Sequence, residues 1–179
     1  VRPGLTQLGQ KFHYGVVPFK DSNVMLNSQY DFTPGVEFYA FGHFGRRVGY
    51  PPDFYRYGTN TPYPKSPLLV NIYPDGFLPE EQGISIDRSL VAGLRGSVDG
   101  WHWDTSVNAG GNRVSYATLN TTNLALVNDF GTSPTNFHDG ILTADQQSFN
   151  IDITKKADFD WLSHPLFIAF GTQWLRQSY

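Results

Sequence analysis

The fold is decided by the stretch Trp101-His102-Trp103-Asp104-Thr105-Ser106-Val107-Asn108. Its odd positions read Trp, Trp, Thr and Val, and its even positions read His, Asp, Ser and Asn. Because successive strand side chains point to opposite faces, this alternation predicts a strand that separates an apolar environment from a polar one. The dipeptide Asp99-Gly100 comes directly before it and favours a tight hairpin turn.

The same alternation recurs along the chain and predicts an all-β protein, an antiparallel meander of about six strands in three hairpins. Most of these strands are near the ~9–11 residues that a tilted strand needs to cross a bilayer. The predicted strands cover residues 24–32, 36–46, 84–96, 101–116, 148–154 and 166–174.

Short and long connections alternate between these strands. Turns are predicted at Thr33-Pro34-Gly35, at Val98-Asp99-Gly100 and between Asp158 and His164. Residues 47–82 and 117–146 are rich in Pro, Gly, Asn, Ser or Thr and show no sustained period. Outer-membrane barrels have this asymmetry of short periplasmic turns and long extracellular loops.

Composition narrows the classes of protein. The 179 residues carry a net charge of −3 and contain no Cys, which excludes disulfides and thiolate metal sites and argues against nucleic acid as a partner. The chain has no run of ~18 apolar residues, so the sequence predicts no transmembrane helix. It stops within the alternating pattern at Trp174-Leu175-Arg176-Gln177-Ser178-Tyr179, and we expect residues 1–179 to be a piece of a larger protein.

Aromatic residues gather near the short turns on the apolar face. Tyr30, Phe32, Trp101 and Trp103 are predicted to form a membrane-interface girdle, where an amphipathic ring meets both headgroups and hydrocarbon. The alternative is that they form the core of a soluble β-sandwich, whose strands alternate equally well. Arg88 interrupts the apolar row, and we expect its side chain to snorkel to an interface.

The sequence offers no convergent catalytic or metal-binding set. The five histidines are scattered and lack a metal-ligand spacing, and no Ser, His and Asp are placed to form a triad. The sequence therefore predicts no enzyme activity, no catalytic residue, no metal and no cofactor.

The first long connection holds the best candidates for ligand contact. Its aromatic and polar residues suit stacking on sugars or chelates and adaptable hydrogen bonding. A loop hydrophobic cluster without a ligand is the alternative. The candidate ligand-binding residues are Phe54, Tyr55, Arg56, Tyr57, Tyr63, Tyr73 and Asp75.

Several short strings, in their order and spacing, resemble the barrel of bacterial TonB-dependent receptors. They are 73–80 (YPDGFLPE), 93–96 (GLRG), 100–104 (GWHWD), 133–137 (SPTNF), 150–152 (NID) and 165–171 (PLFIAFG). The resemblance covers most of the chain from about Val24 onward.

This resemblance implies part of a 22-stranded, plugged barrel in the outer membrane of a Gram-negative bacterium, surrounded by outer-membrane lipid. Such receptors import a scarce ligand, such as an iron chelate (siderophore), cobalamin or an oligosaccharide, with energy from the TonB complex. The plug region that contacts TonB and the closing C-terminal strands have no counterpart in these residues. Two alternatives stay open: a soluble carbohydrate-binding β-sandwich and a passive porin.

Overall fold

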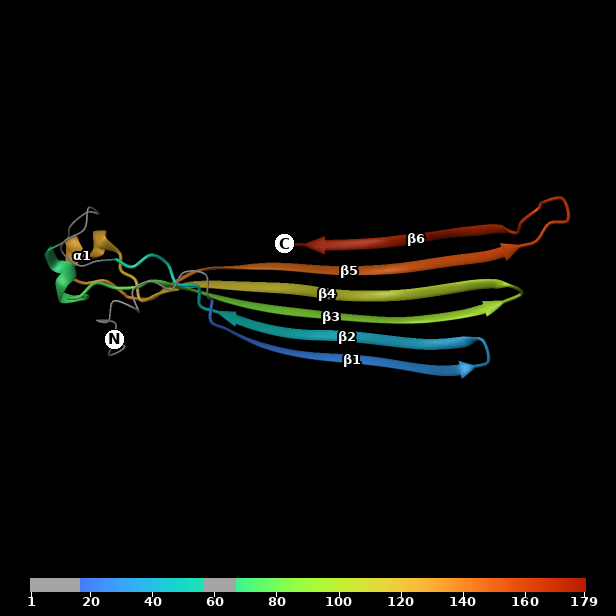
Figure 1. The fold of residues 1–179 in the computed structure, drawn as a ribbon, viewed down its shortest axis with the longest axis horizontal. Helices are drawn as coiled ribbons and strands as arrows, with labels where there is room; N and C mark the ends of the chain where they lie inside the picture. Colours follow the sequence, from blue (N-terminus) through green and yellow to red (C-terminus); the bar gives the residue numbers. More distant parts are fainter. Residues whose placement is uncertain (1–16, 57–66) are drawn as a thin grey trace. The chain divides into compact units, whose positions relative to one another are not determined.

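The computed structural model describes residues 17–56 and 67–179, and these form one six-stranded antiparallel sheet with strand order β1-β2-β3-β4-β5-β6. Each strand pairs with its neighbour in the sequence, so the all-β meander predicted from the alternation is confirmed. Figure 1 shows the strands side by side, with the three hairpin turns at the same end of the strands. The strands are β1 (Phe19–Thr33), β2 (Val36–Gly49), β3 (Glu80–Val98), β4 (Trp101–Leu119), β5 (Phe137–Ala157) and β6 (Leu166–Ser178).

The strands are longer than the alternation alone predicts. β3 begins at Glu80 and β5 at Phe137, whereas the sequence predicted starts at Ile84 and Ser148. The added residues carry polar side chains on both faces, so they show no apolar period, and pairing with the adjacent strand defines them instead. Residues 137–146, which were predicted to be irregular, are therefore strand, and this prediction was wrong.

The described residues of the long connections contain two short helices. The 3-10 helix η2 (Pro67–Asn71) lies between β2 and β3, and α1 (Leu124–Phe130) lies between β4 and β5. The Asn123 side chain caps α1 by accepting from the backbone N–H groups of Ala125 and Leu126 at 3.0 and 3.4 Å. Gly131 ends the helix with φ of 74°, a left-handed conformation that glycine adopts without strain.

The chain divides into two compact units. The sheet unit comprises residues 22–46, 86–113 and 142–179, and the connection unit comprises the described residues of 1–21, 47–85 and 114–141. All six buried hydrophobic residues belong to the connection unit: Val48, Tyr55, Leu69, Phe77, Leu78 and Val127. The core of the described chain is therefore small and lies among the long connections.

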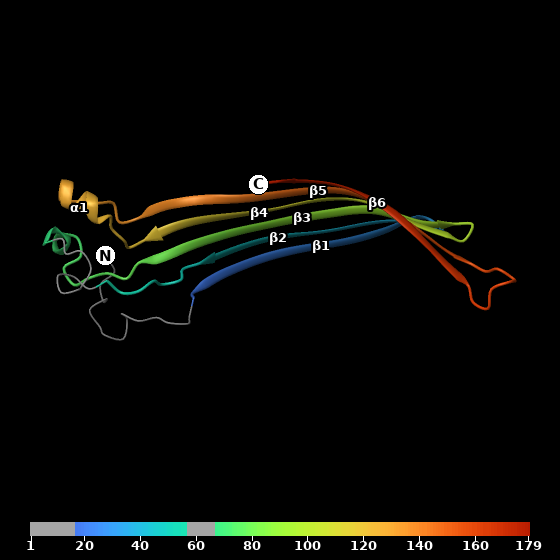
Figure 2. The same ribbon diagram turned by 90° about the horizontal axis from the view of Figure 1, so that it is seen from above.

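The sheet unit is a single layer. The two views of the ribbon show no second sheet over its strands (Figures 1 and 2). Large apolar side chains stay exposed on it, including Leu26 at 60%, Val107 at 53% and Phe170 at 56%. The described residues thus supply no second layer of the kind that a β-sandwich needs to cover an apolar face.

Within residues 17–56 and 67–179, both outer strands of the sheet are unpaired along one side. Every residue of β1 is exposed, and so is every residue of β6 except Ile168. A long unpaired edge presents a row of backbone donors and acceptors to its surroundings. Along its other side β6 pairs with β5 in a regular register that runs from Ala157 opposite Leu166 to Asp145 opposite Ser178.

Candidate functional site: two faces of a sheet and a folded connection

The apolar face of the sheet unit carries the alternating residues that include Leu26, Phe38, Leu90, Val107 and Phe149. Their neighbours across the strands share this face. Phe149 lies opposite Trp174, Ile151 opposite Thr172 and Ile153 opposite Phe170. Three adjacent pairs thus place a continuous apolar strip on β5 and β6, because paired residues in an antiparallel sheet point to the same side.

Aromatic rings meet near the hairpin end of this face. The rings of Tyr30 and Phe32 make an edge contact with centroids 5.2 Å apart, and Phe32 lies 6.5 Å from Phe38. Trp101 meets Phe170 edge-on at 6.1 Å and has the Lys155 ammonium 4.9 Å from its ring centroid. An aromatic ring beside a cation is typical of the boundary between an apolar region and a wet one.

Trp103, the fourth predicted girdle residue, packs over a glycine. A Cβ atom built on Gly96 would lie 2.6 Å from the Trp103 ring and 2.5 Å from the Gly35 carbonyl oxygen. Only a residue without a side chain therefore allows the Trp103 ring and the first hairpin turn to lie against β3 here. The structure places Trp103 and the other three girdle residues on the apolar face near the turns; their contact with a membrane stays a prediction.

The polar face carries a network of side-chain hydrogen bonds between strands. The Tyr39 hydroxyl donates to Asp104 at 2.8 Å, and the Arg95 guanidinium pairs with Glu37 at 2.5 Å. Gln173 donates to Asn150 at 2.7 Å across β5 and β6. A network of this kind satisfies polar groups on a face that is hydrated or that meets another polar surface.

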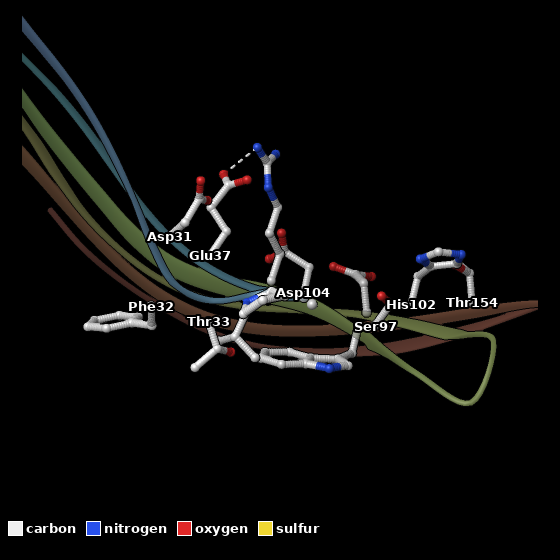
Figure 3. Close-up of a pocket in the computed structure, with 15 residues that line it drawn as sticks. Asp31, Phe32, Thr33, Glu37, Ser97, His102, Asp104 and Thr154 are labelled. Atoms are coloured by element: carbon white, nitrogen blue, oxygen red, sulfur yellow. Dashed lines mark hydrogen bonds and ion pairs between the residues drawn. The ribbon is translucent and has the colours of Figure 1, made fainter.

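A hollow of about 910 Å³ lies at the hairpin end of the sheet unit (Figure 3). Figure 3 shows Asp31 and Glu37 on one side of the strands and Phe32 on the other. Four acidic side chains line it, from Asp31, Glu37, Asp104 and Asp152, together with Arg95 and His102. One carboxylate oxygen of Asp104 accepts from the Tyr39 hydroxyl, which ties this part of the lining to the hydrogen-bond network of the polar face.

The connection unit folds around some of its own aromatic residues. Tyr55 is only 6% exposed, and its hydroxyl donates to the Asp75 carbonyl oxygen at 2.6 Å. The Tyr73 ring stacks on Phe77 with centroids 4.4 Å apart, and the Tyr73 hydroxyl donates to the Thr121 carbonyl oxygen at 3.1 Å. This last bond joins the two long connections, and partial burial raises the pKa of the Tyr73 hydroxyl.

The predicted ligand-binding residues therefore have different surroundings. Tyr55 and Tyr73 pack inside the connection unit, while Arg56 pairs with Asp53 at 2.9 Å. Phe54 is 61% exposed, and Asp75 is also exposed. Tyr57 and Tyr63 lie outside the described residues. Of the predicted residues that the structure describes, Phe54 and Asp75 are the most exposed.

An ion pair on the apolar face was not predicted from the sequence. The Arg88 guanidinium lies 3.0 Å from the Asp145 carboxylate, and both side chains are more than half exposed. The pair passes directly over Gly111, where a Cβ atom would collide with Asp145 and lie 3.1 Å from Arg88 Nε. The alternation placed Arg88 on this face correctly, but its partner is 57 residues away in the sequence.

Within residues 17–56 and 67–179 no helix is long and apolar enough to span a membrane. The same residues hold no group of three or more His, Asp or Glu side chains that could bind a metal ion.

Comparison of the chain with protein-family models, with curated proteins and with solved structures finds no match.

Proposed function

We propose that this chain is part of an outer-membrane β-barrel, and that the whole protein is a TonB-dependent receptor that imports a scarce ligand. One observation carries the proposal: among the described residues the sheet unit leaves an apolar face uncovered, while its opposite face carries hydrogen bonds and an ion pair between side chains of neighbouring strands. At ~25 cal/mol per Å² of apolar surface, such a face is costly to leave in water. Acyl chains would cover it without a second protein layer.

The two open edges support the same proposal. In the hydrocarbon region every backbone N–H and C=O group needs a partner, so a spanning sheet has to close on itself. β1 and β6 present unpaired edges that further strands of the same barrel would satisfy. A chain that ended its sheet at these edges in water would expose two long templates for aggregation.

The import of a specific ligand rests on the resemblance described above and on the folded connection unit. Long connections that pack around their own aromatic core present a defined surface, as ligand-binding loops do. Phe54 is the exposed aromatic residue that such a surface offers beside Asp53 and Arg56. An iron chelate or an oligosaccharide has the polar and planar groups that these side chains recognise.

Membrane fractionation tests the barrel. When the complete protein is exported in a Gram-negative host, we expect it in the outer-membrane fraction and expect its extraction to require detergent. Recovery as a soluble monomer in buffer would contradict the proposal.

Uptake separates the receptor from a passive porin. Cells that depend on the protein for a scarce iron chelate or oligosaccharide should lose accumulation of that ligand when TonB is deleted. Uptake that continues without TonB would identify a passive pore. If cells that contain TonB take up none of the ligands tested, the proposed import is contradicted, while the barrel itself is not.

A further inference from the structure

Arginines on the two faces of the sheet unit differ in their partners. On the polar face Arg95 pairs with Glu37. The apolar face carries four exposed arginines, one on each of β2, β3, β4 and β6: Arg46, Arg88, Arg113 and Arg176. Within the part of the chain that the structure describes, Arg88 alone among these four has an ion-pair partner.

These four arginines, which we call the arginine row, lie toward the end of the apolar face that is away from the hairpin turns. On β6 Arg176 follows the last apolar residue of the alternation, whereas on β2 and β3 apolar residues (Val48, Ile86 and Ile84) continue beyond the arginine. Arg46 lies two residues beyond Phe44 and Arg176 two beyond Trp174, so alternation places each on the same face as its apolar neighbour. Arg88 is two residues from Leu90, so the two side chains share a face. Arg113 comes two residues after Gly111, and Gly111 lies beneath the Arg88 side chain, so Arg113 is on this face as well. The arginine row thus crosses the sheet near the end of the apolar face that is away from the hairpin turns.

The arginine row has a large excess of positive charge. Asp145 is the one acidic residue among the described residues at this level of the apolar face, so the row carries four guanidinium groups and one carboxylate, which pairs with Arg88. A hollow of about 620 Å³ is lined by Arg88, Arg176 and Asp145 and by the small residues Ala109 and Gly110. The hollow can therefore accept a group larger than water beside two guanidinium groups.

We propose that the arginine row binds the phosphate groups of membrane lipids in the leaflet farther from the hairpin turns of the sheet unit. The inference rests on the barrel proposed above, in which the apolar face meets hydrocarbon and its border meets headgroups. Guanidinium groups bind phosphate oxygens bidentately, and they do so best where no carboxylate already neutralises them. Arg113 and Arg176 meet this condition, while Asp145 holds Arg88 in place beside them.

Vesicle flotation tests the proposal. The complete protein is diluted from urea into vesicles of phosphatidylcholine alone or of phosphatidylcholine mixed with phosphatidylglycerol, and the bound fraction is measured. The variant Arg113→Gln/Arg176→Gln leaves the Arg88–Asp145 pair intact. The matched control Arg47→Gln/Arg95→Gln removes the same charge from residues on the polar face.

We expect wild type and control to prefer the anionic vesicles, and the Arg113→Gln/Arg176→Gln variant to lose about tenfold of that preference. All proteins should bind phosphatidylcholine vesicles equally. An equal preference in all three proteins would overturn the arginine row as the lipid site while the barrel stands. Binding to neither vesicle would contradict the barrel itself, and the inference with it.

A competition arm separates lipid from free phosphate. Inorganic phosphate is added to the anionic vesicles and compared with chloride at the same ionic strength. We expect both salts to weaken binding equally, because the headgroups are held at the membrane surface and inorganic phosphate is not. Selective loss of the preference in phosphate would show a site for the free anion and overturn the lipid assignment.

Discussion

The connection unit and the sheet unit use apolar residues in opposite ways. In the connection unit Val127 is fully buried and packs within a small core, as in any protein folded in water. In the sheet unit Val107 is 53% exposed on a face that nothing among the described residues covers. In the proposed barrel the connection unit folds in water and the sheet unit contacts lipid, so we expect the same substitution in each to fail in different ways.

The largest effect is expected from Val127→Asp. This substitution places an unpaired carboxylate in a fully buried site, which costs on the order of 3 kcal/mol or more. We expect the connection unit to become sensitive to limited proteolysis while the protein still assembles in the membrane. Phe130→Asp is the matched control, because Phe130 follows on the same helix and is 73% exposed. Equal protease resistance of the Val127→Asp variant and wild type would show that this core does not hold the connections.

A smaller but more diagnostic effect is expected from Val107→Asp. In water a charge at a half-exposed position costs little, whereas on a lipid-facing strand it costs on the order of 2 kcal/mol near the bilayer centre. We expect a reduced yield of membrane-inserted protein, measured by heat-modifiable migration on a gel. Asn108→Asp, the next residue and on the polar face, should insert normally. If both variants insert like wild type, the apolar face does not contact lipid.

Leu90→Asp and Trp101→Asp probe the two borders of the same face. Leu90 lies beside the arginine row, and Trp101 lies in the aromatic cluster at the hairpin end. The cost of an outward charge falls to about 1 kcal/mol or less near the interfaces, so both variants should insert better than Val107→Asp. A defect in either that exceeds the Val107→Asp defect would mean that the apolar band is centred elsewhere.

The sequence predicted the strands well where they cross the apolar face and less well beyond it. Phe149, Ile151 and Ile153 alternate with polar residues, and this signal located β5. The residues from Phe137 to Gln147 belong to the same strand but have polar groups on both faces, so only their pairing reveals them. Periodicity reports the environment of a strand, and it fades where both faces are wet.

Helix α1 was missed although the sequence carries its signals. Asn123 and Gly131 stand at the two ends of Leu124–Phe130 and cap the helix. Asn and Gly are common at helix ends, but they are equally common in loops, and the abundance of both in residues 117–146 favours an irregular loop. The Arg88–Asp145 pair is different in kind, because no local pattern links residues that β4 separates in the sheet.

The candidate ligand residues show the same limit. Composition selected Tyr55 and Tyr73 as contact residues, and the structure shows that both support the connection unit from within. Aromatic residues in a long connection are equally suited to binding and to packing, and only the burial of each ring separates the two uses. Of the described aromatic residues in the predicted set, Phe54 is the one left exposed.

The smallest effect is expected from Tyr73→Phe, which tests the bond between the two long connections. Loss of the hydroxyl removes its bond to the Thr121 carbonyl and should destabilise the connection unit by about 1 kcal/mol.

The pH dependence of stability gives a sharper test of the same hydroxyl. Burial raises the Tyr73 pKa, so the folded unit holds this proton more tightly than the unfolded chain does, and stability falls as the pH rises above the ordinary tyrosine pKa of about 10. Proteolysis rates measured on either side of that pH should rise more steeply for wild type than for Tyr73→Phe. Identical profiles of proteolysis rate against pH would show that the Tyr73 hydroxyl does not link the two connections. A flatter profile in the variant would show that this hydroxyl contributes to the stability of the connection unit.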